Sequence, residues 1–410
     1  MQECVSGNDS IPIWPQMTEF LTNSRFMVLA GSNFFLFLVV SAWSFLSIFV
    51  SDLGANTGDI GVLMASAGIT SLGSLPFIAP LIDRYGRKNF IVLGILMVGV
   101  SNLGFMFFES YSHWMLLIRL LQGLAFAACF NACSTAMVDL LPFHKRVQGI
   151  GLYGISGSLA VAIGPYLGET ILIHYGFSAY FVLLAIFGVF GACLALTFTE
   201  LPRTDRSRES RVKFFPTVFE GKHIAMMALV AVFGSGFAAM NTFFPLFAKS
   251  LGIRAGIFFS SYGVFLIFVR VVLGSLVDRM DRDKLILFCL IGFGTLLVAT
   301  SQIQALWQTV FLGGLFGVTQ GISYPAMMAR MVDRSTDINR AIVVSLFTGS
   351  FGVGINLSVL LWGFIANLQS LSFMFVFGGC LMLLAAFFCV LMFALNRSPS
   401  APTQGIVPHK

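Results

Sequence analysis

Charged side chains are concentrated in one short segment of this sequence, "PLIDRYGRKNF" at residues 80–90. Asp83, Arg84, Arg87 and Lys88 fall within six positions, although only 10% of the 410 residues are charged. Gly86 between them permits a tight turn, and Asp83 can accept from Arg87 or face the positive start of a neighbouring helix. The chemistry that this segment predicts is reversible ion pairing.

The same pattern recurs in the second half of the chain. "LVDRMDRDK" at 276–284 matches "LIDRYGRK" at 81–88, and Asp278 follows Asp83 by 195 residues. Two further matches keep nearly the same period: Asp139 and Arg146 with Asp333 and Arg340, and "FLSIFVSDLG" at 45–54 with "FFPLFAKSLG" at 243–252. Three matches in the same order indicate an internal duplication. Two such halves suit a transporter that rocks about a central axis.

The composition predicts a membrane protein. Hydrophobic residues make up 57% of the chain, with 45 Phe, and stretches of about 20 apolar residues recur, each long enough to cross a bilayer as a helix. Continuous apolar runs favour helices over barrel strands. We predict an all-α protein with twelve transmembrane helices at residues 26–50, 60–82, 89–109, 113–137, 147–171, 177–198, 223–247, 257–277, 285–303, 306–328, 341–364 and 371–395.

Basic residues give the expected orientation. With both termini in the cytoplasm, 20 of the 24 Lys and Arg lie on the cytoplasmic side, and only Lys249 and Arg254 lie outside. This asymmetry follows the positive-inside rule. The net charge of +6 is spread along the membrane face, where it can contact lipid headgroups, so we expect no nucleic-acid partner.

The longest polar loop divides the chain into two pseudo-symmetric six-helix bundles. The predicted organisation is a cytoplasmic N-terminal tail at 1–25, an N-terminal bundle at 26–198, a cytoplasmic linker at 199–222, a C-terminal bundle at 223–395 and a cytoplasmic tail at 396–410. We expect a monomer in the cytoplasmic membrane of a bacterium, without cofactor or bound metal.

Several motifs resemble those of the major facilitator superfamily, most closely its bacterial drug:proton antiporter and sugar-efflux branch. "APLIDRYGRK" at 79–88 is similar to the family's Gly-x-x-x-Asp-Arg-x-Gly-Arg-Arg/Lys loop, with Ala79 replacing the leading Gly. "GSLVDRMDR" at 274–282 is its second copy, with Asp281 replacing the later Gly. "RLLQG" at 119–123 and the glycine-rich "GLYGISGSLAVAIGPYLG" at 151–168 resemble two further family motifs, the second typical of exporters.

The resemblance implies a role for the charged loops. It predicts that they hold the two bundles together on the cytoplasmic side in the outward-open state, with the start of the helix near Arg340 as docking partner. The alternative is that the basic residues anchor the loops to lipid headgroups. The predicted conformational latch comprises Asp83, Arg84, Gly86, Arg87, Lys88, Asp139, Asp278, Arg279, Arg282, Asp333 and Arg340.

Arg119 is the first candidate for contact with a ligand or proton coupling. It lies six residues into its predicted helix, roughly 9 Å from the outer end, where an arginine is costly and usually faces a cavity. Alternatively it extends outward or bonds a helix carbonyl. Arg270 either lines the cavity or pairs with Asp278, and the pairing is favoured.

Polar residues farther along the helix of Arg119 and inside other helices are further candidates for substrate binding, although each could instead hold helices together. They are Gln122, Asn131, Asn33, Asn241, Gln320 and Asn356. No acid lies near mid-membrane, so Glu169 and Asp52, expected near Arg119, are the candidates for proton coupling. Gly157, Gly164, Pro165 and Gly168 predict close helix packing and a bend.

The expected function is alternating-access secondary transport, namely proton-coupled efflux of a drug-like compound, sugar or metabolite, and not enzymatic catalysis. One alternative is an importer or facilitator of a sugar, organic acid or metal-chelating metabolite, with uniport left open. Another is a membrane receptor or scaffold that moves no solute. A lipid-processing enzyme is disfavoured because all five His lie at or beyond helix ends.

Overall fold

The computed structural model describes residues 20, 22–142, 146–200, 221–274, 280–333, 335 and 340–395. Ten helices of this part are long and apolar enough to cross a membrane. One of them, Gln148–Leu196, has 49 residues and turns back at Gly176 (φ 78°, ψ −178°), so it crosses twice. Helix α13 (Leu306–Asp333) is not among these ten, but its 28 residues are long enough for a crossing. With both arms of the bent helix and α13 counted, the described helices correspond to the twelve predicted ones.

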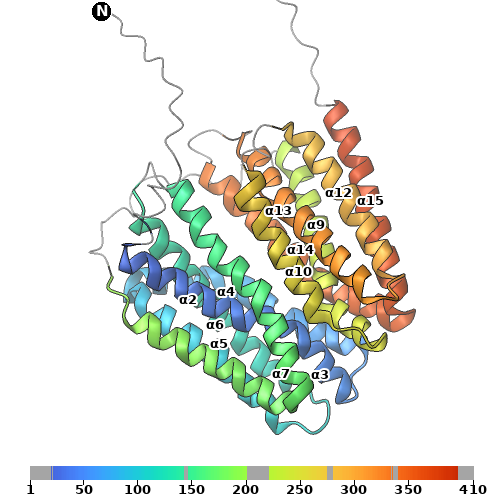
Figure 1. Cartoon of the computed structure of the whole chain (residues 1–410). Helices are drawn as coiled ribbons and strands as arrows, with labels where there is room; N and C mark the ends of the chain where they lie inside the picture. The colour runs from blue at the N-terminus through green and yellow to red at the C-terminus, as the bar shows by residue number, and fades with distance from the viewer. Residues whose placement is uncertain are drawn as a thin grey trace, which may run out of the picture.

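The helices form two bundles (Figure 1). The first half comprises α2 (Ser24–Ala42), η1 (Trp43–Phe45), α3 (Leu46–Asp52), α4 (Thr57–Tyr85), α5 (Arg87–Val100), η2 (Ser101–Phe107), α6 (Met115–Leu140) and α7 (Arg146–Leu196). The second half comprises α9 (Gly221–Ser250), α10 (Ala255–Phe268), the π-helical η4 (Val269–Leu273), α12 (Arg282–Thr300), α13, α14 (Arg340–Leu368) and α15 (Leu371–Leu395). We call the end where α7 stops and α9 begins the linker end, and the opposite end the distal end.

Side-chain caps and one glycine define several helix boundaries. Asn23 accepts from the backbone N–H of Arg25 at 3.0 Å, and Asn56 accepts from that of Asp59 at 2.9 Å, at the starts of α2 and α4. Gly86 has φ 91°, a conformation that favours glycine, and it ends α4 immediately before α5 begins. The charged loop is therefore a tight turn between two helices.

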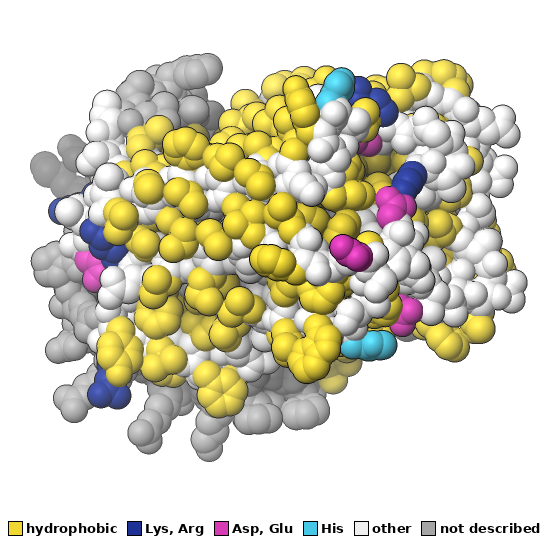
Figure 2. Space-filling view, turned by 90° about the horizontal axis from the view of Figure 1, so that it is seen from below, with side chains coloured by type: hydrophobic (Ala, Val, Ile, Leu, Met, Phe, Trp, Pro, Cys, Tyr) yellow, Lys and Arg dark blue, Asp and Glu magenta, His cyan; other side chains and the backbone are white. Residues whose placement is uncertain are grey.

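The outer surface has the distribution that a bilayer requires. Figure 2 shows charged side chains toward the two ends of one face and a broad hydrophobic region between them. Large apolar side chains such as Phe190 and Phe288 are 60% and 70% exposed. Exposed apolar surface of this extent fits lipid contact rather than water.

Small residues bring the two bundles together along two antiparallel seams, α4 with α14 and α7 with α10. A Cβ added to Gly61 would lie 3.1 Å from the Cα of Gly363. On the other seam, a Cβ added to Gly263 would lie 2.4 Å from the Cα of Ala162. Both seams therefore depend on backbone approach that only small residues permit.

The seams close at the distal end and separate toward the linker end. On α4 and α14, contacts run from Gly58 beside Asn367 inward to Leu72 beside Gly352. The next small residues along the contacting faces of α7, η4 and α14 are Gly151, Gly274 and Gly349, and a Cβ added to any of these would meet nothing within 4 Å. The described halves are thus joined distally and apart at the linker end.

Candidate functional site

A carboxylate at the distal end of one bundle binds the start of a helix in the other. Glu169 of α7 accepts from the backbone N–H of Gly256 at 3.0 Å and lies 3.4 Å from Nε of Arg254. Arg254 also donates to Thr170 at 3.1 Å. Gly256 is in the first turn of α10, where unpaired N–H groups favour an anion. We call Glu169, Thr170, Arg254 and Gly256 the Glu169 cluster.

The Glu169 cluster is buried, and a second ion pair lies nearer the surface. Glu169 is 6% exposed and is the only buried carboxylate among the described residues. Asp52 pairs with Lys249 across the two halves, and both side chains are exposed. Glu169 and Asp52 were expected near Arg119, and this expectation is wrong: each contacts a basic residue of the other bundle. The reason is that both lie where the two bundles meet, whereas Arg119 points into its own bundle.

Arg119 is held inside the N-terminal bundle. It is 3% exposed, donates to Gln122 at 2.8 Å, and reaches the carbonyls of Leu63 and Met64 at 3.4 Å. Its guanidinium lies 4.6 Å from the ring centre of Trp43. Asn102 accepts from Gln122 and from Trp43, which completes what we call the Arg119 cluster: Arg119, Gln122, Asn102 and Trp43.

The predicted amides differ in their partners. Asn131 and Asn241 donate to carbonyls of their own helices, those of Ala127 and Phe237. Asn33 joins α2 to α7, because it donates to Ser156 and accepts from Tyr153.

Two of the amides stand out from this set. Asn356 lies against Gly68 at the α4–α14 seam and donates to the carbonyl of Gly352. Gln320 is 4% exposed, and its Nε2 has no hydrogen-bond partner among the described residues. A buried donor without an acceptor is unusual in proteins, so Gln320 is a candidate to donate to a bound ligand.

Arg270 is the last polar contact of the α7–α10 seam before the bundles separate. It lies on η4 and donates to Ser158 of the other bundle at 3.0 Å. The expected partner, Asp278, lies outside the described residues.

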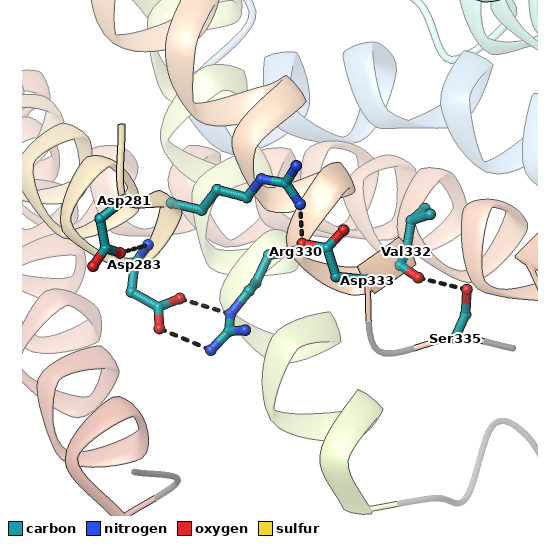
Figure 3. A network of polar contacts seen from close by, with 7 residues as sticks. Asp281, Asp283, Arg330, Val332, Asp333 and Ser335 are labelled. Carbon is teal, nitrogen blue, oxygen red and sulfur yellow. Dashed lines mark hydrogen bonds and ion pairs between the residues drawn. The ribbon is translucent and has the colours of Figure 1, made fainter. Parts of the chain in front are cut away.

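The predicted latch residues form ion pairs within each bundle. Arg87 of α5 pairs with Asp139 of α6, and the equivalent Arg282 of α12 pairs with Asp333 of α13. The second bundle adds a bidentate pair of Arg330 with Asp283, at 2.6 and 2.8 Å (Figure 3). The repeated geometry follows the sequence duplication.

The remaining latch residues have other positions. Asp83 is exposed and makes no hydrogen bond or ion pair with any described residue, so the expected bond with Arg87 is absent there. Arg84 stacks on Tyr85 at 5.3 Å. The N–H of Lys88 donates to Glu200 at 2.5 Å, and Glu200 lies against Gly86. Asp278, Arg279 and the side chain of Arg340 lie outside the described residues.

The glycines predicted to pack helices all face α2. A Cβ added to Gly157, Gly164 or Gly168 would meet the side chains of Asn33, Ser41 or Tyr180 at 3.2, 2.5 and 3.0 Å. The Ser41 contact belongs to α2, and the Gly168 position also borders Ala42 of α2. Pro165 lies inside α7, and its carbonyl lies beside Gly256 across the seam.

Sequence reasoning missed several partners of the predicted site residues. Lys249, Arg254, Gly256, Glu200 and Arg330 all contribute contacts that no motif indicated. One signal was present: Lys249 and Arg254 are the only two basic residues assigned to the outer side, and they are the two that pair across the bundles.

Taken together, two repeated bundles that meet at one end and separate at the other define the class of alternating-access membrane transporters. Comparison with known families agrees. The family model described as Major Facilitator Superfamily matches residues 28–257 and 253–408. The chain belongs to this superfamily. It is therefore a multi-pass membrane protein and a secondary transporter of small molecules, not an enzyme.

Individual relatives are distant. The chain is 26% identical over 366 residues to the staphylopine export protein of Staphylococcus aureus, covering 84% of this chain and 90% of that protein. It is 26% identical over 322 residues to the multidrug resistance protein MdtG of Escherichia fergusonii, covering 73% and 78%. The crystal structure of the nucleoside transporter NupG matches with a TM-score of 0.72 at 14% identity, covering 90% of this chain and 99% of that one, which supports the fold.

Proposed function

We propose that this transporter exports a small organic molecule from the cytoplasm in exchange for protons. The observation that carries the proposal is the pair of seams, closed at the distal end and open at the linker end. If the linker end is cytoplasmic, as the positive-inside rule predicts, this is the conformation that receives cytoplasmic solute. The similarity to a staphylopine exporter and to multidrug resistance proteins supports export.

We propose that proton coupling acts through the Glu169 cluster. A group couples protons to a conformational change when its proton affinity differs between the two conformations. Glu169 contacts Gly256 and Arg254 only while the bundles meet distally, so opening that end replaces these partners with other surroundings. Its proton affinity must change with the conformation, which satisfies the physical requirement.

Solute export can be tested without guessing the substrate. We would compare metabolites inside cells with and without the protein, with and without a protonophore. Export predicts solutes that are depleted in expressing cells, and a difference that vanishes with the protonophore. Solutes that accumulate in expressing cells would instead indicate an importer. A difference in solute level that persists with the protonophore would indicate a facilitator. If no solute differs, the protein acts as a receptor or scaffold.

Proton coupling through Glu169 can be tested separately from solute export. In Glu169→Gln, we expect the proton gradient to drive no net export while solute–solute exchange across vesicles continues, because the carboxylate that titrates is lost and the path of the solute is kept. Glu109→Gln is the matched control, since Glu109 is an exposed acid of the first half. Gradient-driven export that survives Glu169→Gln unchanged would exclude this carboxylate as the coupling site.

The proposed orientation and domain division follow from the same picture. We propose that the protein is monomeric in the cytoplasmic membrane, with both termini and the 199–222 linker in the cytoplasm. A reporter fused after Lys410 should be active only if it is a cytoplasmic reporter such as a fluorescent protein. Activity of a periplasmic phosphatase fused there would reverse the orientation.

A further inference from the structure

We propose that Arg270 binds an acidic group of the solute, so that the substrate is an organic anion bearing a carboxylate or phosphate. This inference rests on the proposed transport function, and it names the substrate class. Five observations support it: the position of Arg270, the charges around it, the π-helical backbone that carries it, an unpaired donor on α13, and the aromatic rings beside Tyr324.

The first observation is the position of Arg270 between the two bundles. Arg270 donates a hydrogen bond to Ser158 across the seam. A Cβ added to Gly154 would lie 3.8 Å from Nη1 of Arg270. The next small residues toward the linker end, Gly151 and Gly274, have nothing within 4 Å of an added Cβ. Arg270 therefore lies where the two bundles begin to separate. A solute entering from the linker end would meet it there and contact both bundles.

The charge balance favours an anion. Arg270 is exposed, and no described carboxylate contacts it. The only buried carboxylate of the described residues, Glu169, is already occupied by Arg254 and Gly256 at the distal end. A guanidinium inside a membrane protein without a local counter-ion attracts an anion, and its planar donors match a carboxylate or phosphate.

Local backbone structure sets Arg270 apart from an ordinary packing residue. The segment Val269–Leu273 is π-helical between the α-helical turns of α10 and Gly274. Such segments are rare and occur frequently at functional sites, because the wider turn changes the direction of a side chain.

Helix α13 packs against η4, because a Cβ added to Gly321 would lie 3.0 Å from Val269, the neighbour of Arg270. Gln320 and Tyr324 are four residues apart and share one face of the helix. The buried Nε2 of Gln320 has no acceptor among the described residues. Tyr324 packs against Phe347 and Phe351 with ring centres 4.9 and 5.2 Å apart, which offers an apolar wall. An unpaired donor and an aromatic wall on the helix that packs against η4 fit an acid attached to an apolar body.

The first test uses purified full-length protein and a matched pair of probes, 2-naphthoate and 2-naphthamide, which differ in charge but hardly in shape. Binding measured at constant ionic strength should favour the naphthoate in the wild type. Arg270→Gln should weaken naphthoate binding at least about tenfold, the effect of losing a charged hydrogen-bonded pair. Arg270→Lys should retain part of the preference. Equal binding of both probes, or binding of neither, would contradict the proposal.

Ser158→Ala distinguishes anion binding from a merely structural seam contact. It removes the same inter-bundle hydrogen bond but leaves the charge, so the preference for naphthoate should persist. If Ser158→Ala reproduces the loss seen in Arg270→Gln, Arg270 only joins the bundles. The comparison of naphthoate with naphthamide binding to the wild-type protein needs no variant. It tests the proposed anion site even if Arg270→Gln does not fold.

Transport data separate this inference from the proposed function. Solutes whose cellular levels depend on the protein should carry a net negative charge, and Arg270→Gln should abolish their movement. Neutral or cationic solutes would overturn the anion site while leaving export intact. Naphthoate binding in a protein that moves no metabolite would uphold the site and overturn the export proposal.

Discussion

At the scale of single residues, the membrane interior contains two kinds of charge. Arg119 is satisfied by neutral groups of its own bundle, whereas Glu169 and Arg270 make contacts that cross between bundles. A contact that crosses must break or form when the bundles rock, while one inside a bundle can remain. Glu169 and Arg270 are thus the intramembrane charges placed to sense the conformational change.

Loss of the Glu169 charge should favour opening of the distal end. Glu169→Gln keeps the size of the side chain but removes the ion pair with Arg254 and weakens the bond from Gly256. Hydrogen bonds to charged groups contribute about 1.5–3 kcal/mol, so the population of the distal-closed form should fall about tenfold or more. A cysteine placed at Ser260 on the seam, in a background without the seven native cysteines, should then react faster with a thiol reagent. Unchanged reactivity would mean that other seam contacts hold the distal end.

Arg119 should matter chiefly for stability of the first bundle. Lysine at this position retains the charge but cannot reach Gln122 and the carbonyls of Leu63 and Met64 together. We expect Arg119→Lys to lower the melting temperature by several degrees, while Arg25→Lys, at the partly exposed start of α2, should not. If Arg119→Lys is as stable as the wild type but has lost gradient-driven export, Arg119 instead takes part in proton coupling.

At the scale of the helices, a larger side chain on the α7–α10 seam should push the two bundles apart. In Gly263→Ala, the new methyl would lie 2.2 Å from Cβ of Ala162, so the distal end could close only by moving α10 from α7. We expect increased thiol reactivity at the distal seam and slower transport. Gly274→Ala is the matched control, because it follows on the same face, beyond the point where the bundles separate, and a Cβ there meets nothing within 4 Å. Equal effects of both substitutions would show that the helix, not the seam, is sensitive to alanine.

The helices were predictable and the seams were not. Apolar runs and charged loops located α2 to α15 within a few residues, because hydropathy alone requires those crossings. The chain has 41 glycines, and only their neighbours show that Gly61 and Gly263 face the other bundle whereas Gly164 faces its own. The Arg87–Asp139 pair could be expected from the duplicated spacing. The contacts of Glu169 and Arg270 could not, because they join helices about 85 to 110 residues apart in sequence.

At the scale of the whole molecule, the charged loops and the seams act at opposite ends. In this conformation the latch residues Arg87 and Arg282 pair within their own bundles, at the end where the halves are apart. Distally, Glu169 and Asp52 pair between bundles. Closing one end must therefore open the other, if each bundle moves as a rigid body.

A cross-link at the distal end tests this rigid-body exchange. A Cβ added to Gly58 lies 3.9 Å from Cβ of Asn367, within the range that a disulfide spans. In the background without native cysteines, oxidised Gly58→Cys/Asn367→Cys should move no solute, because the distal end cannot open, and a reductant should restore flux. Gly58→Cys alone should transport in both oxidising and reducing buffer. Undiminished flux through the fully cross-linked protein would show that solute passes without separation of the distal seam, and alternating access between the two bundles would have to be abandoned.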